Sequence, residues 1–265
     1  MSATLSRSGG PRVGLGNWII ILACGLFFLV PLIVTGIFSL WEGGHSYGVS
    51  SYVLLIHSSG FWRSLLLSLQ LAIETILLSF VLLVPAMIFV HLKAPKLKPL
   101  FEFIATLPFV IPAIALIAGL STLYTGPNWL IGTPNYLVIP YFFLALPYGY
   151  RSIDVGLNTL DVKTLTEAGQ SLGAGWGRII VLILLPNMTA ALVGATLLTL
   201  TIVMGEFTFA SVLLFKTFAV FINDTGQNAV TEAAALSLFS FVLTWIAMLG
   251  VIVAGKRQRT RIGAR

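Results

Sequence analysis

Long apolar runs alternate with short polar segments along the whole chain. An α-helix rises 1.5 Å per residue, so about 20 apolar residues cross the hydrocarbon core of a bilayer. The pattern therefore predicts an all-α membrane protein with six transmembrane helices, of which the fourth is short. The predicted spans cover residues 18–40, 64–90, 101–124, 136–150, 179–203 and 236–254. They form one transmembrane domain, 17–255, between a tail at 1–16 and a basic tail at 256–265.

The composition agrees with a membrane protein and gives no sign of a soluble one. Hydrophobic residues make up 57% of the chain and charged residues only 9%, with a mean hydropathy of +0.98. Soluble domains carry about 25% charged residues. The net charge of +6 does not indicate a nucleic-acid partner, because the cations lie beside the apolar runs and not among exposed aromatic residues.

The lysines and arginines predict the orientation of the chain in the membrane. Of the 15 cations, Arg63 and Lys216 lie in one set of alternating segments and the other thirteen lie in the opposite set. Cations accumulate in cytoplasmic segments. Both termini and the polar segment 151–178 are therefore predicted to be cytoplasmic. The thirteen are Arg7, Arg12, Lys93, Lys96, Lys98, Arg151, Lys163, Arg178, Lys256, Arg257, Arg259, Arg261 and Arg265.

The polar segment 151–178 has the pattern of a short amphipathic helix followed by a glycine-rich bend. Thr164 and Glu167 fit a capping box, which predicts either a helix start or a fresh turn of a helix at Thr164. One face of the predicted helix carries Leu157, Leu160, Leu165, Ala168 and Leu172. The permissive backbone for the bend is expected from Gly173, Gly175 and Gly177. The chain then enters the fifth predicted span.

The spacing of residues from Glu167 to Pro186 resembles the EAA signature of bacterial ABC-importer permeases. The matching positions, which we expect to couple the chain to an ATPase, are Glu167, Ala168, Gly169, Leu172, Gly173, Ile183, Leu185 and Pro186. The family usually has alanine where this chain has Gly169. In that family this segment is a cytoplasmic coupling helix that docks into a cleft of the ATPase subunit.

The resemblance extends over roughly residues 50–255 and implies a type I importer permease of the bacterial inner membrane. Its expected partners are two ATPase subunits, a second permease subunit that we expect to be a paralogue, an extracytoplasmic solute-binding protein and the lipid bilayer. ATP and Mg are expected on the ATPase, and no cofactor on this chain. Leu107-Pro108, Ile111-Pro112 and Ala145-Leu146-Pro147 match the family's placement of proline within the third and fourth spans. Gly205-Glu206-Phe207 is similar to the subgroup that serves polyamines, sulfate, ferric ion and aminoethylphosphonate.

Four residues are candidates for the transport pathway: Glu74, Glu206, Pro108 and Pro112. A carboxyl group within a span is costly, so Glu74 either faces a pathway or is neutralised by helix packing. Glu206 is either a gate residue that attracts cations or a charge at a helix end. The prolines either shape a cavity wall or kink helices for packing. Glu102 is expected to pair with Lys98 at the membrane edge.

The sequence carries no sign of an enzyme or a metal site. It has no phosphate-binding loop and no catalytic triad, and its single cysteine and three dispersed histidines have no ligand spacing. ATP hydrolysis is therefore expected on a separate subunit. The competing classes are a proton-coupled secondary transporter that uses Glu74, and a membrane scaffold. The predicted solute is a polyamine, with an organophosphonate, ferric ion or a sulfate-type anion as alternatives. Outer acidic residues favour a cation: Glu42, Glu206, Asp224 and Glu232.

Overall fold

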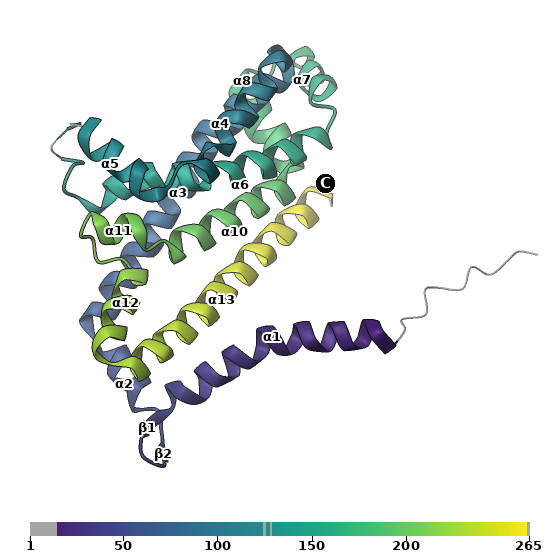
Figure 1. Cartoon of the computed structure of the whole chain (residues 1–265). Helices are drawn as coiled ribbons and strands as arrows, with labels where there is room; N and C mark the ends of the chain where they lie inside the picture. The colour runs from purple at the N-terminus through teal and green to yellow at the C-terminus, as the bar shows by residue number, and fades with distance from the viewer. Residues whose placement is uncertain (1–14, 124–125, 128, 264–265) are drawn as a thin grey trace, which may run out of the picture.

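The computed structural model describes residues 15–123, 126–127 and 129–263. Most of the predicted N-terminal tail, with Arg7 and Arg12, lies outside these residues. Helices dominate the structure (Figure 1). In chain order they are α1 (Leu15–Ser39), α2 (Ser50–His57), α3 (Ser59–Lys93), α4 (Lys98–Val110), α5 (Ala113–Leu123), α6 (Val138–Asn158), α7 (Val162–Ser171), α8 (Trp176–Arg178), α9 (Leu185–Asn187), α10 (Thr189–Gly205), α11 (Thr208–Val212), α12 (Phe218–Asn228) and α13 (Val230–Gly263).

Shorter elements fill some of the connections. Two 3₁₀ turns cover Pro95–Leu97 and Pro134–Leu137, and a π-helix covers Ile179–Leu184. A small antiparallel hairpin, β1 (Trp41–Gly43) and β2 (Ser46–Tyr47), pairs Trp41 with Tyr47. The predicted all-α class therefore holds apart from this hairpin.

Four helices in the described part of the chain are long and apolar enough to cross a membrane. They cover Gly16–Ser39, Ser59–Lys93, Thr189–Val212 and Val230–Val253. A fifth span results if Pro95–Val110 and Ala113–Thr122 are taken together, although they meet at 103°. The remaining predicted span falls in α6, where Arg151 and Asp154 interrupt the apolar run. Six spans therefore remain a prediction.

The sharp bend between α4 and α5 follows from the proline positions. Ile111 has an extended backbone, and Pro112 directly follows it. A residue before proline is pushed out of the helical region, so the helix ends at this point. Pro108 lies inside α4, which continues past it to Val110. The predicted interruption of this span is confirmed, and Pro112 marks the break.

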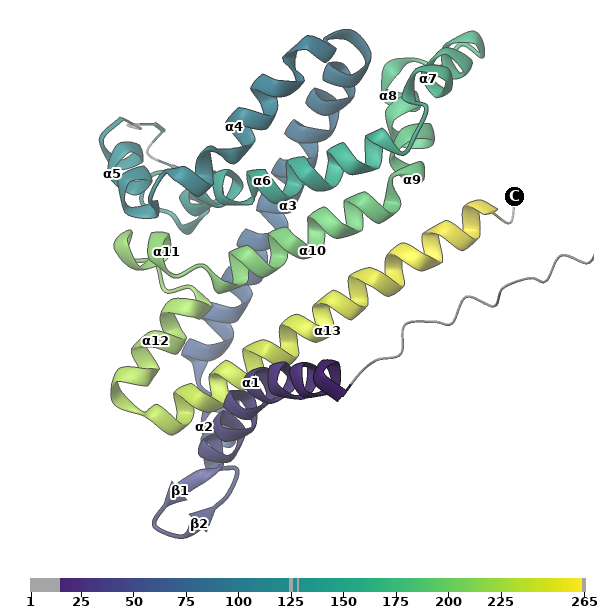
Figure 2. The same cartoon turned by 45° about the vertical axis from the view of Figure 1, so that its right-hand side comes forward.

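The core of the fold is made by α3, α6 and α10, which cross one another in the middle of the molecule (Figure 2). Close packing of α6 on α10 depends on small residues. A Cβ atom at Gly156 would lie 2.5 Å from Ala191 Cβ, and one at Gly194 would lie 2.9 Å from Ser152 Oγ. On α10 the small residues at this contact are Gly194 and the buried Ala195. Ala190 instead lines a cavity.

The two ends of the bundle differ in character. One end carries the turn between α3 and α4 together with α7 and α8, and the other carries the hairpin and α2 (Figures 1 and 2). The first end, which we term the polar end, collects segments 91–100 and 159–178. These are two of the segments that the cation distribution predicts to be cytoplasmic. Helix α13 continues from the last predicted span into the predicted basic tail, as far as Gly263.

Helix α1 stands apart from the core. Its apolar stretch Gly16–Ser39 has no buried residues in its most apolar window, and its main contact is with α13. Figure 1 shows α1 diverging from α13 toward the N-terminus. At its other end, the hydroxyls of Ser39 and Tyr52 share a hydrogen bond of 2.7 Å.

Candidate coupling site at the polar end

The segment that carries the EAA-like residues folds as a separate helix, α7. Helix α6 runs on past the predicted span to Asn158, and a three-residue break precedes α7. Asp161 caps the new helix: its Oδ1 accepts the Thr164 backbone N–H at 3.1 Å and its Oδ2 accepts the Thr164 hydroxyl at 2.7 Å. Of the two alternatives for Thr164, the helix start is therefore wrong, since Asp161 is the N-cap. These hydrogen bonds favour the carboxylate and hold the pKa of Asp161 below its ordinary value.

The buried face of α7 differs from the predicted leucine face. Val162, Thr166 and Gly169 are buried, at spacings of four and three residues, while Ala168 and Leu172 are exposed. Leu157, Leu160 and Leu165 of the predicted face do pack against the core, whereas Ala168 and Leu172 do not. The prediction assumed one helix through residues 157–172, and the break before α7 changes the helical phase. The leucine pattern belongs partly to the end of α6.

Gly169 allows α7 to sit closely on the start of the next membrane helix. A Cβ atom there would lie 2.9 Å from Ile183 Cδ1 and 3.0 Å from Ile179 Cγ1. Both isoleucines belong to the π-helix, which leads into α9 and Pro186. Ile183 and Ile179 thus support α7 from below, and Leu185 and Pro186 follow them in α9.

The opposite face of α7 is free to meet a partner. The Glu167 side chain is 63% exposed, and its ion pair with Lys163 is long at 4.0 Å. Leu172 is 88% exposed at the end of the helix. The EAA-like residues therefore divide into two groups. Gly169 and Ile183 hold the helix in place, while Glu167, Ala168 and Leu172 lie on the surface.

Gly173 closes α7 with a Schellman motif. Its N–H donates to Gln170 O at 2.9 Å, and the Ala174 N–H donates to Gly169 O at 3.0 Å. The φ of Gly173 is +77°, which suits glycine. The other two glycines do not need this freedom, because Gly175 has φ of −74° and Gly177 lies in α8. The bend predicted from three glycines thus depends on Gly173.

We expect Gly173→Val to loosen the end of α7, because a side chain with a Cβ in the left-handed region costs roughly 1–2 kcal/mol. Gly175→Val is the matched control, since a Cβ there has no heavy atom within 4 Å and φ is negative. Hydrogen exchange at Ala174, whose N–H makes the closing bond, measures the effect. Equal exchange in the two variants would contradict the prediction.

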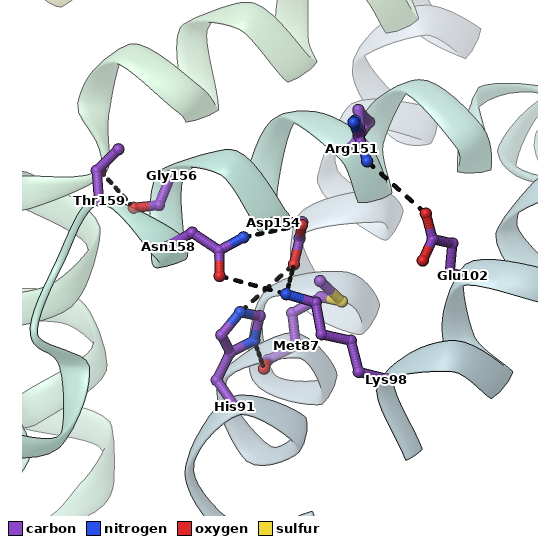
Figure 3. A network of polar contacts seen from close by, with 9 residues as sticks. All are labelled: Met87, His91, Lys98, Glu102, Arg151, Asp154, Gly156, Asn158 and Thr159. Carbon is purple, nitrogen blue, oxygen red and sulfur yellow. Dashed lines mark hydrogen bonds and ion pairs between the residues drawn. The ribbon is translucent and has the colours of Figure 1, made fainter. Parts of the chain in front are cut away.

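A polar network around the buried Asp154 joins three helices near the end of α6 (Figure 3). Asp154 of α6 is only 6% exposed. Its Oδ1 lies 3.0 Å from Lys98 Nζ of α4 and 3.4 Å from His91 Nε2 of α3, while its Oδ2 accepts Asn158 Nδ2 at 2.9 Å. Lys98 also donates to Asn158 Oδ1 at 3.2 Å, and His91 Nδ1 donates to Met87 O at 2.9 Å. We call Asp154, Lys98, His91 and Asn158 the clasp.

The clasp changes the predicted ion pairing. Glu102 was expected to pair with Lys98, but Lys98 turns to Asp154 and Glu102 lies 3.7 Å from Arg151 (Figure 3). The pairing of Glu102 with Lys98 is wrong because α6 brings two charged residues against α4. Asp154 was missed. Its signal in the sequence is a carboxylate three residues after Arg151, directly after the predicted fourth span.

A cavity of about 600 Å³ opens between α4, α6 and the α9–α10 region. Phe109 of α4 and Tyr148 of α6 meet edge to face at 5.6 Å in its wall. Arg151 is the one charged residue among the lining residues. The others that line it are Pro147, Ser152, Val155, Gly156, Thr159, Asn187, Met188, Ala190, Ala191 and Leu198. Pro108 and Pro112 are not among them, although Phe109 is the residue after Pro108.

The two candidate pathway carboxylates lie away from this cavity. Glu74 is half-buried on α3, where it accepts a hydrogen bond of 2.8 Å from Gln70. Glu206 is buried at the end of α10, and its Oε1 accepts the Phe209 N–H at 2.8 Å. It therefore caps the start of α11, as a residue at a helix end does. Within the described residues, no three His, Cys, Asp or Glu side chains group as metal ligands.

The fold is shared with solved transporter structures. The chain is similar to a chain of the bacterial alginate ABC transporter in complex with alginate pentasaccharide-bound periplasmic protein, with a TM-score of 0.69 and 16% identity over 91% of this chain and 94% of that one. It is also similar to a chain of a bacterial ABC transporter involved in the import of the acidic polysaccharide alginate, with a TM-score of 0.65, 17% identity and the same coverage. The likeness is one of fold, and it spans nearly the whole chain. No protein-family model and no curated protein sequence matches the chain.

Proposed function

We propose that the chain is the permease subunit of an ATP-driven, binding-protein-dependent importer in the bacterial inner membrane. The observation that carries this proposal is the exposed face of α7. The EAA-like residues Glu167 and Leu172 project from a short helix at the polar end of a membrane bundle. The likeness to ABC-transporter chains over 91% of the sequence supports the same function.

The chain itself would form half of the translocation pathway and would not hydrolyse ATP. Two ATPase subunits would dock on α7 and on its counterpart, and would hold ATP and Mg. A second permease subunit, which we expect to be a paralogue, would complete the bundle. The exposed apolar surface of α1 offers contact area for it. A solute-binding protein would deliver the solute at the end with the hairpin, and both termini would be cytoplasmic.

The predicted choice of solute depends on the acidic residues expected on the outer side of the membrane. The polyamine prediction used four outer carboxylates, and two of them make local hydrogen bonds. Glu206 caps α11, and Glu42 accepts the Ser50 N–H at 3.1 Å, which holds the pKa of Glu42 below its ordinary value. Asp224 remains exposed. Polyamine import therefore rests mainly on the subgroup resemblance.

An acidic solute is the second candidate, because Arg151 is the one charged residue that lines the described cavity. A similar fold serves a transporter for an acidic polysaccharide. Thermal unfolding of the purified binding protein with spermidine, sulfate, aminoethylphosphonate or an alginate pentasaccharide separates these solutes. The solute that raises the unfolding midpoint at micromolar concentration is the one carried.

Gentle extraction of the tagged chain from its host membrane tests the importer class. We expect a nucleotide-binding ATPase and a second multi-span chain to co-purify. Recovery of the chain alone in several detergents would contradict the proposal. A proton-coupled transporter using Glu74 would then be the better explanation, and the Glu74→Gln variant would abolish uptake driven by a pH gradient.

A further inference from the structure

Helix α4 is a rod whose two ends are both interrupted. The 3₁₀ turn Pro95–Leu97 precedes it, and the extended residue Ile111 with Pro112 follows it. The α-helical hydrogen-bond ladder of α4 is therefore not continuous with that of α3 or of α5. The position of α4 relative to the core therefore depends on side-chain contacts, and most of these reach α6.

Two ion pairs join α4 to α6, and their surroundings differ. Lys98 meets Asp154 at 3.0 Å within the clasp, where the Asp154 side chain is 9% exposed. Glu102 meets Arg151 at 3.7 Å, with both side chains more than half exposed. An exposed pair contributes little, whereas a buried carboxylate that loses its partners is strongly unfavourable. The clasp, and not the outer pair, fixes α4 on α6.

The clasp lies beside the cavity and close in sequence to the predicted docking helix, since Gly156 and Thr159, which flank Asn158, line the cavity. Asn158 is the last residue of α6, and only three residues separate it from α7. At the other end of the α4–α6 contact, Phe109 and Tyr148 meet in the cavity wall. A displacement of α7 would therefore act first on the end of α6 next to the clasp, and it would reach the cavity wall through α6 and α4.

We propose that the clasp makes α4 and the end of α3 move together with α6 when α7 is displaced. The cavity wall formed by Phe109 and Tyr148 then shifts as one unit. This inference rests on the proposed function, because the displacement would come from the docked ATPase. Asp154, Lys98, His91 and Asn158 are positioning residues, since they act through the helices and not on the solute.

Distances between spin labels in the intact complex test the inference. The single cysteine, Cys24, is exposed and can be replaced by serine. Cysteines at Phe103 on α4 and Val155 on α6, both exposed, then carry the labels. A second pair, Val155 and Leu249 on α13, reports whether α6 moves at all. Each pair is measured without nucleotide and with ATP and vanadate.

In the parent complex we expect the distance from Phe103 to Val155 to stay constant while the distance from Val155 to Leu249 changes. In Asp154→Asn the first distance should change between the two states by about 2 Å or become broadly distributed, which is the scale of helix shifts. Glu102→Gln is the matched control. It breaks the exposed pair between the same two helices and should behave like the parent.

Identical distance distributions in the parent and in Asp154→Asn would overturn the inference. A constant distance from Val155 to Leu249 in the parent would instead overturn the proposed function, since α6 would not respond to nucleotide. If Asp154→Asn fails to assemble, Lys98→Gln gives the same comparison. The Lys98 side chain is 35% exposed, and a glutamine there removes the charge that faces Asp154.

Discussion

Glu167→Lys should abolish stable binding of the ATPase while leaving the permease folded in the membrane. The side chain is 63% exposed, and its contact with Lys163 at 4.0 Å contributes little to stability. Reversing its charge places a cation at the surface that we propose contacts the ATPase, where the native residue is an anion. Like charges across an interface cost several kcal/mol, so the affinity should fall by at least about tenfold, or 1.4 kcal/mol.

The amount of ATPase that co-purifies with the tagged variant measures this loss. Glu102→Lys is the matched control, because it makes the same charge change at an exposed carboxylate of α4, away from α7. Glu102→Lys should retain the ATPase. Equal recovery of ATPase from the parent and from Glu167→Lys would show that α7 is not the docking element.

Gly156→Leu should be the most destabilising substitution in the core. A Cβ atom at Gly156 would lie 2.5 Å from Ala191 Cβ, and neither atom can move without shifting a helix. Overpacking costs about 1–3 kcal/mol, which for a chain of this size lowers the unfolding midpoint by roughly 3–10 °C. The larger side chain would also force α6 and α10 apart and enlarge the cavity that Gly156 lines.

Thermal unfolding in detergent measures this effect. Gly250→Leu on α13 is the control, because a Cβ there meets no heavy atom within 4 Å. It makes the same change of residue within a membrane helix. A midpoint for Gly156→Leu equal to that of Gly250→Leu would contradict the close-packing argument.

The hydrophobic pattern predicted the membrane helices because span length and apolarity are local properties. The bend near Pro112 and the Gly173 turn also followed from single residues with fixed backbone preferences. The start of α7 could not be predicted in this way, because Asp161 and Thr164 are both residue types that cap helix N-termini. The structure shows that Asp161 is the cap. The predicted face held for Leu157, Leu160 and Leu165 but not for Ala168 and Leu172, because it assumed one continuous helix and missed the break before α7.

The contacts between helices could not be predicted from the sequence alone. Lys98 lies four residues before Glu102, which suggests a pair along one helix. Because α6 packs on α4, Lys98 instead pairs with the buried Asp154, which is 56 positions away in the sequence. The sequence alone left Glu206 open between a gate and a charge at a helix end. Its hydrogen bond to the Phe209 N–H at the start of α11 fits the second role, and the gate role stays a prediction.

The isolation of α1 has a consequence for how the chain is made. Its main contact is with α13, the last helix, and about 190 residues separate the end of α1 at Ser39 from the start of α13 at Val230. At about 5–20 residues per second, ribosomes need about 10–40 s to synthesise that length. During that time α1 lacks its main helix contact within the chain, and only the hydrogen bond of Ser39 with Tyr52 of α2 can form early. A helix that must stay in lipid for so long alone has reason to be apolar on every side, as Gly16–Ser39 is.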